Sequence, residues 1–225
     1  MDRPLWRDRD IRTFLAGRAA SEIGSRITRE GLPIVAILVA GASPRQLGLL
    51  AALSSVAALL TGLWAGVFVD RRRRRPVMIA CDLVRTGLLL TIPLAAAFHR
   101  LDFPQIAAVT ALVGVATLLF QVADQAWLPQ FVSRSRLEEG NALVHAASAV
   151  GETGGPTLMG VLFQLVGGPL AIAVDALSYV VSAVSLSRIR RAEPGPQQGA
   201  RGSLSGEAVA GIREVFRPDF RHSLL

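Results

Sequence analysis

The most highly charged segment of the sequence interrupts a long apolar stretch. Gly66–Pro76 reads GVFVDRRRRRP, in which one acid, Asp70, is followed by the arginines 71–75. An arginine cannot be neutralised by deprotonation, and burying it in hydrocarbon costs several kcal/mol. In a soluble protein such a block would favour a nucleic-acid or nuclear-localisation patch. Here about twenty apolar residues flank it on each side, so the block indicates a tight cytoplasmic turn between two membrane helices.

A second set of charges falls inside an apolar stretch, where it could bind a substrate or move protons. Its members recur at three- and four-residue steps and so share one arc of a helix. They are Arg18, Glu22, Arg26, Arg29 and Glu30. Such a face avoids lipid and turns toward a bundle interior or a water-filled cavity. Alternatively, the charges of alternating sign only neutralise one another so that the helix can insert, and the two roles are compatible.

Three further positions carry charge within apolar stretches. Asp82 and Arg85 are three residues apart, which places them on one helix face as an expected ion pair. Glu152 lies near the middle of another stretch, where it is either a proton carrier or the partner of an arginine in the first span. Asp175 lies near the outer end of the last stretch and is expected at the membrane interface.

Small residues surround Glu152 in the segment GETGGPTLMG. Glycines four residues apart, such as Gly151 and Gly155, form a smooth groove that lets another helix approach closely. Pro156 removes a backbone hydrogen bond and is expected to bend the helix.

Composition narrows the classes of function. The 225 residues are 51% hydrophobic and carry a formal net charge of +7, and every basic residue is an arginine. The arginines gather between apolar stretches, so a nucleic-acid partner is not expected. The single cysteine, Cys81, excludes an intrachain disulfide. The sequence has no nucleophile triad, metal cluster or phosphate loop, and His99, His145 and His222 are scattered. We therefore expect no enzyme, no cofactor and no metal site.

Six stretches are long and apolar enough to span a bilayer. The sequence therefore predicts an all-α membrane protein, a bundle of six transmembrane helices. The spans are Thr13–Ala40, Gln46–Val69, Pro76–Phe98, Pro104–Trp127, Gly140–Val166 and Pro169–Leu186. Fifteen arginines fall in the N-terminal segment, in alternate gaps and after the last span, against Arg45 and Arg100 in the other gaps. Both termini are accordingly predicted to be cytoplasmic.

Four regions follow from this pattern. Residues 1–12 form a cytoplasmic N-terminus and residues 13–188 the six-helix domain. Residues 189–206 are rich in Pro, Gly, Gln and Ser, which predicts a flexible cytoplasmic linker. Residues 207–225 have an amphipathic helical pattern that suits the membrane surface and lead toward a missing seventh span.

The motifs together resemble the N-terminal half of a major facilitator superfamily transporter. The family's signature between its second and third spans is G-x-L-x-D-R-x-G-R-[KR], and Phe68 and Arg73 depart from it. The matching positions are Gly66, Asp70, Arg71, Arg74 and Arg75. In the fifth span a similar antiporter pattern is matched, with Met159 departing from it, by Gly151, Gly155, Pro156 and Gly160. Further segments are similar to macrolide-efflux-like and enterobactin-exporter-like permeases, and they are Asp82–Arg85, Pro129–Asn141 and Asp175–Tyr179.

The resemblance implies half of a major facilitator fold, in a secondary transporter of the plasma membrane that exports a small molecule in exchange for protons. Asp70 would latch the cytoplasmic side by contacting a helix of a C-terminal half. Asp82 and Arg85 would belong to the same gating region, and the substrate site would lie between the two halves. The implied partners are the lipid bilayer, a small-molecule substrate, and a C-terminal six-span half or a second copy of the chain.

The sequence ends at Leu225, about where a seventh span would begin. Three interpretations stay open: an N-terminal half that has been shortened, a half-transporter that forms homodimers, and a membrane interaction protein without transport activity. The last predicts that Asp70→Asn or Glu152→Gln changes nothing measurable.

Overall fold

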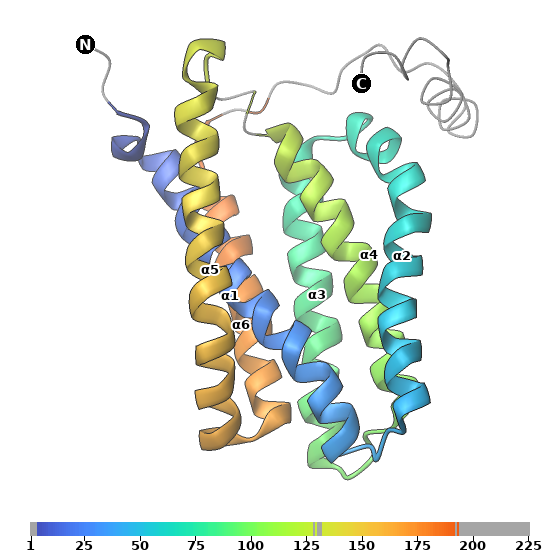
Figure 1. Ribbon diagram of the computed structural model, residues 1–225. Helices are drawn as coiled ribbons and strands as arrows, with labels where there is room; N and C mark the ends of the chain where they lie inside the picture. The colour runs from blue at the N-terminus through green and yellow to red at the C-terminus, as the bar shows by residue number, and fades with distance from the viewer. Residues whose placement is uncertain (1–3, 128, 130–131, 192, 194–225) are drawn as a thin grey trace, which may run out of the picture.

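The chain folds into a bundle of α-helices (Figure 1). The computed structural model describes residues 4–127, 129, 132–191 and 193. The described α-helices are α1 (Arg9–Leu38), α2 (Pro44–Asp70), α3 (Arg74–Ala97), α4 (Phe103–Trp127), α5 (Leu137–Val166) and α6 (Gly168–Arg188). Two short 3-10 turns, η1 (Leu5–Arg7) and η3 (Arg134–Arg136), precede α1 and α5. The predicted all-α fold class is confirmed.

Local signals explain where the first two helices begin. The carboxylate of Asp8 accepts hydrogen bonds from the backbone N–H groups of Asp10 and Ile11, at 2.9 and 3.4 Å. At the start of α2, the Ser43 hydroxyl accepts from the Gln46 N–H at 3.4 Å, while the Gln46 side chain accepts from the Ser43 N–H at 2.8 Å. Only residues 39–43 connect α1 to α2, so these two helices run antiparallel.

The helices form two groups that lie side by side. α1 packs against α5 and α6, whereas α4 packs against α2 and α3. Contact between α3 and α6 joins the groups, which occupy the left and right of Figure 1. Much of the core between them is apolar, and Ile92, Ile106 and Ile172 are fully buried in it.

The outer surface of the bundle is also apolar. Leu59 of α2, Leu94 of α3 and Leu165 of α5 are exposed by 72%, 59% and 76%. Many exposed large apolar side chains of this kind are unfavourable in water and suit a lipid environment. Four helices contain a stretch long and apolar enough to cross a membrane, at Pro44–Gly62, Arg74–Ala97, Phe103–Trp127 and Gly168–Arg188.

Two of the predicted spans do not have such a stretch within the described residues, and they correspond to α1 and α5. The charged arc lowers the hydropathy of α1, and Glu152 with its neighbouring small and polar residues lowers that of α5. Of the predicted linker at 189–206, only 189–191 and 193 are described, and the amphipathic segment at 207–225 lies outside the described residues.

Candidate functional site

The arginine block forms a tight turn between two helices. α2 continues through Asp70 and α3 begins at Arg74, so that only residues 71–73 connect them. The Asp70 carboxylate lies 3.5 Å from the guanidinium of Arg74. The Arg74 side chain is 8% exposed, whereas that of Asp70 is 55% exposed. Asp70 therefore presents most of its surface outward from the bundle.

Gly66 lies one turn before Asp70 on the same face of α2. A Cβ atom built at Gly66 would meet nothing within 4 Å. Packing inside the described bundle therefore gives no reason for a glycine at this position.

The residues after α6 return to the arginine turn. The Glu193 carboxylate accepts hydrogen bonds from the backbone N–H groups of Arg74 and Arg75, at 2.5 and 3.2 Å. The Arg75 guanidinium also donates to the Ser187 carbonyl at 2.5 Å. A carboxylate at a helix N-terminus is stabilised by the unpaired N–H groups and by the helix dipole. Glu193 thus caps α3 from the far end of the described chain.

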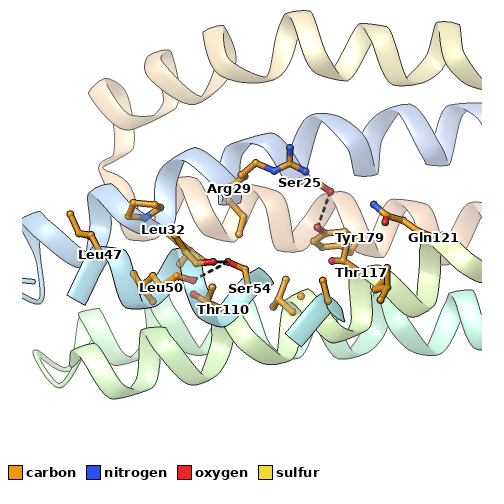
Figure 2. A pocket seen from close by; sticks show the side chains of 17 residues that line it. Ser25, Arg29, Leu32, Leu47, Leu50, Ser54, Thr110, Thr117, Gln121 and Tyr179 are labelled. Atoms are coloured by element: carbon orange, nitrogen blue, oxygen red, sulfur yellow. Dashed lines mark hydrogen bonds between the residues drawn. The ribbon is translucent and has the colours of Figure 1, made fainter. Parts of the chain in front are cut away.

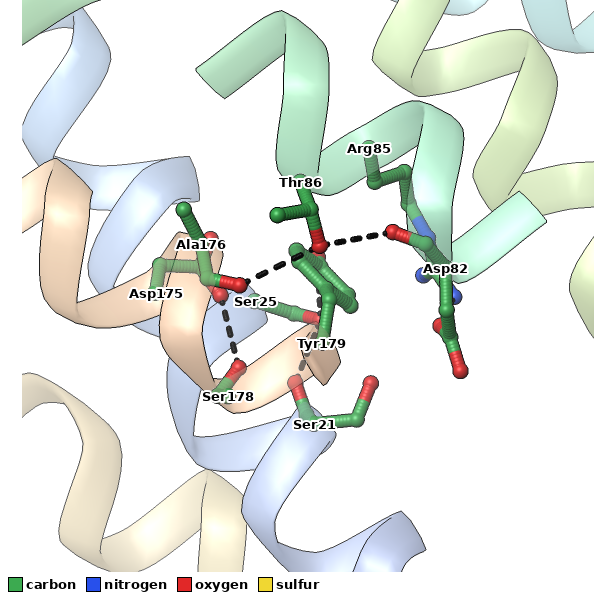
Figure 3. Close-up of polar contacts among 9 residues, drawn as sticks. All are labelled: Ser21, Ser25, Asp82, Arg85, Thr86, Asp175, Ala176, Ser178 and Tyr179. Carbon is green, nitrogen blue, oxygen red and sulfur yellow. Dashed lines mark hydrogen bonds and ion pairs between the residues drawn. The ribbon is translucent and has the colours of Figure 1, made fainter. Parts of the chain in front are cut away.

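The predicted pair of Asp82 and Arg85 forms, and it belongs to a buried polar cluster (Figure 3). Arg85 is 2% exposed, and its guanidinium lies between two rings, 4.5 Å from the centroid of Phe120 and 4.1 Å from that of Tyr179. The Tyr179 hydroxyl is hydrogen-bonded to Ser25 Oγ at 2.9 Å. Helices α1, α3, α4 and α6 therefore meet around one cation.

The expectation that Asp175 is interfacial is wrong. Asp175 is fully buried, and its Oδ1 accepts a hydrogen bond from Ser178 Oγ at 3.1 Å (Figure 3). A Cβ atom added at Gly24 would collide with both side chains. Because position 24 is a glycine, α1 can approach α6 so closely that α1 covers the Asp175 carboxylate.

The charged residues of α1 have partners on three helices, which are α1 itself, α4 and α5. Arg18 forms an ion pair with Asp124 of α4, and its Nε also donates to Ser148 Oγ of α5 at 3.4 Å. Arg26 lies 3.9 Å from Glu22 within α1 and 2.6 Å from Glu152 of α5. The alternative in which the charges of α1 neutralise one another is thus met only in part within α1, by Arg26 and Glu22, among the described ion pairs.

Glu152 and its neighbouring glycines lie along α1. The Glu152 side chain is 60% exposed and hydrogen-bonded to Arg26, so the predicted alternative that pairs it with an arginine of the first span is the contact that forms. A Cβ atom at Gly151 would lie 2.6 Å from Glu22 Cγ, and one at Gly155 would lie 2.5 Å from Arg26 Cβ. At Gly160 it would meet nothing within 4 Å, and Pro156 is exposed. The close helix approach predicted for the glycines occurs at the first two of them.

A cavity of about 450 Å³ opens between α1, α2 and α4 (Figure 2). Leucines form much of its wall, and polar groups come from all three helices, among them Arg29, Ser54 and Gln121. Tyr179 of α6 also lines it and connects it to the buried cluster around Arg85. A mostly apolar wall with a few polar groups is typical of small-molecule sites of this size.

Several of these residues are not identifiable as site residues from the sequence alone. Asp124, Gln121 and Glu193 act with residues far away in the chain, so no local spacing links them to their partners. Asp175 and Tyr179 are four residues apart and share a helix face, which is a signal that could have placed both inside the bundle. Among the described residues, no three His, Cys, Asp or Glu side chains are grouped as metal ligands would be.

Comparison with known proteins agrees with this architecture. Residues 19–224 match the family model of the Major Facilitator Superfamily. The chain is 26% identical over 196 residues to "Multidrug efflux pump Tap" of Mycolicibacterium fortuitum, in an alignment that covers 83% of this chain and 47% of the relative. The chain thus spans about half the length of the curated relative it matches. With most of its length matched by the family model, the chain belongs to the Major Facilitator Superfamily of membrane transporters.

Proposed function

We propose that this chain forms half of an exporter, and that the cavity between α1, α2 and α4 is one wall of its substrate site. The cavity of about 450 Å³ carries this proposal, because its leucines and few polar groups suit a small lipophilic molecule. The similarity to a relative named as a multidrug efflux pump supports the same class of activity.

All six helices cross the plasma membrane in this proposal, with residues 1–12 and the linker at 189–206 in the cytoplasm. The difficulty is the charge on α1, because an unpaired ion in hydrocarbon is costly. The ion pairs of Arg18 with Asp124 and of Arg26 with Glu152 reduce this cost. Short connections and the distribution of arginines support the orientation.

A second half, or a second copy of the chain, completes the transporter. Two residues of α2 support the need for a second half. Gly66 leaves open space on the helix surface, and Asp70, one turn later, presents an exposed carboxylate. A helix of the second half can approach closely at Gly66 and donate hydrogen bonds to Asp70. Opening and closing of that contact would allow the two halves to rock.

Protons are the coupling ion in this proposal, and the charged arc of α1 is their pathway. Glu22 and Glu152 both lie beside Arg26, and Glu30 is exposed on the same helix. Protonation of Glu152 removes its negative charge and weakens its hold on Arg26, which can then move. This links the binding of a proton to a change in shape at the α1–α5 contact.

The test is an efflux assay in cells that express the chain alone, or together with a C-terminal six-span half. Thr117→Trp fills the cavity and is expected to abolish export, whereas Leu177→Trp, on the outer face of α6, serves as a control. Asp70→Asn is expected to reduce export without lowering the amount of protein in the membrane.

The outcomes separate the alternatives. Export by the chain alone would indicate a functional homodimer, and export only with a second half would support the half-transporter. Absence of export from both preparations would favour a membrane interaction protein, for which Asp70→Asn and Glu152→Gln change nothing measurable.

A further inference from the structure

A second hollow lies beside the arginine turn. Its volume is about 470 Å³, and its walls are the end of α2, the first half of α3 and the middle of α4. The walls are almost entirely apolar and include Phe68, Val84 and Leu88. It forms because α2 and α3 contact each other little and α4 packs between them (Figure 1).

The hollow and the proposed substrate cavity lie on opposite sides of α4. Leu112, Val115 and Leu119 line the hollow, whereas Thr117 and Gln121 line the cavity. At about 100° per residue, these two sets lie on opposite faces of the helix. If the cavity faces the transport pathway, which rests on the proposed function, the hollow faces the bilayer.

Positive charge marks one end of the hollow. Arg72 and Arg73 both line it and are both exposed. The guanidinium of Arg72 lies 4.6 Å from the centroid of the Phe68 ring, which holds the cation against the apolar wall. None of the described residues that line the hollow is acidic. The charge at its mouth therefore favours an anionic ligand with an apolar tail.

We propose that this hollow binds an anionic phospholipid, with one acyl chain between α2, α3 and α4 and the phosphate held by Arg72 and Arg73. Arginine presents a planar set of donors that matches phosphate oxygens and keeps its charge at all physiological pH values. Basic pockets between membrane helices are suited to such headgroups. A zwitterionic lipid has the same chains but no net charge, so it binds more weakly.

Native mass spectrometry of the full chain in detergent tests the proposal. The probes are phosphatidylglycerol and phosphatidylcholine with identical acyl chains. The unmodified chain is expected to prefer phosphatidylglycerol, and Arg72→Gln/Arg73→Gln to weaken its binding roughly tenfold to thirtyfold. Arg45→Gln/Arg100→Gln removes the same charge at the opposite ends of α2 and α3 and is the matched control.

A second variant tests the acyl-chain position independently of charge. Ala80→Trp places a bulky ring in the hollow and is expected to weaken binding of both lipids, whereas Leu177→Trp on the outer face of α6 leaves it unchanged. The proposal would be overturned if Arg45→Gln/Arg100→Gln weakened phosphatidylglycerol binding as much as Arg72→Gln/Arg73→Gln does. Unchanged lipid binding in Ala80→Trp would overturn it as well. Displacement of the lipid by the same concentration of inorganic phosphate would show an anion site without an acyl-chain site. The assay measures binding alone, so a failure of export would not affect its result.

Discussion

Arg18 of α1 forms an ion pair with Asp124 of α4, although these two helices contact each other little elsewhere. The Arg18 side chain is 19% exposed and that of Asp124 is 6% exposed. The pair connects the group of α1, α5 and α6 to the group of α2, α3 and α4. Its loss should therefore weaken the contact between the two groups.

Removal of either charge of this pair is expected to destabilise the chain, because the remaining charge is left partly buried. Arg18→Met and Asp124→Leu should each cost about 2–4 kcal/mol of unfolding free energy, less than a fully buried pair because Arg18 is partly exposed. The double variant should recover much of that loss. Equilibrium unfolding in mixed micelles measures these values, and Arg29→Met, at an exposed position on the same arc, is the control. Strictly additive losses would show that the two charges do not interact.

The glycines of α5 are expected to differ in their tolerance of a methyl group. Gly155→Ala places a Cβ atom 2.5 Å from Arg26 Cβ, so α1 and α5 must separate, at a cost of about 1–3 kcal/mol. Gly160→Ala meets nothing within 4 Å and should be neutral or stabilising by up to about 1 kcal/mol. Thermal unfolding of the two variants compares them directly. Equal destabilisation of both would show that helix packing is not the reason for the glycine at 155.

Glu193→Ala is expected to loosen the start of α3. The variant loses the carboxylate that accepts from the Arg74 and Arg75 N–H groups, at a cost of about 1 kcal/mol. Hydrogen exchange should become faster at these two amides and stay unchanged in the middle of α3. Glu138→Ala removes an acid from the first turn of α5 and should leave both amides protected. If Glu138→Ala has the same effect, the loss of net charge explains it better than the loss of a cap.

Glu139, just before the predicted fifth span, is expected to make stability depend on pH. The Leu5 N–H donates to its carboxylate at 2.8 Å, and this bond, followed by the Arg136 guanidinium, lowers the pKa of Glu139. Because the pKa is lower in the folded chain, the stabilisation is complete above the ordinary glutamate pKa of about 4.3. It is lost as the pH falls through the folded value.

The measurement is the difference in unfolding free energy between the unmodified chain and Glu139→Gln as a function of pH. That difference should be constant near neutral pH and shrink below about pH 4.3. A difference that grows as the pH falls would contradict the assignment.

The positions of the helices could be predicted because they depend on local sequence. A helix forms at each of the six predicted stretches, although only four of these helices are apolar enough to cross a membrane by length and composition, and the arginines at 71–73 mark the turn between α2 and α3. The pair of Asp82 and Arg85 was also predictable, since a spacing of three residues fixes both on one helix face.

The partners of the other charges depend on how the helices pack, which no local spacing contains. Arg18 has an acid four residues away in Glu22, yet it forms its ion pair with Asp124 of another helix. Asp175 was placed at the interface from its distance to the end of the apolar stretch. It is buried because Gly24 allows α1 to cover it, and that contact joins distant parts of the chain.

The position of Arg85 limits how the bundle can move. Its guanidinium is held between Phe120 of α4 and Tyr179 of α6, and it pairs with Asp82 of α3. Separation of any of these helices would expose a permanent cation to hydrocarbon, at a cost of several kcal/mol. The three helices are therefore joined through this one side chain, and a rearrangement of the bundle that keeps Arg85 buried has to carry α3, α4 and α6 together.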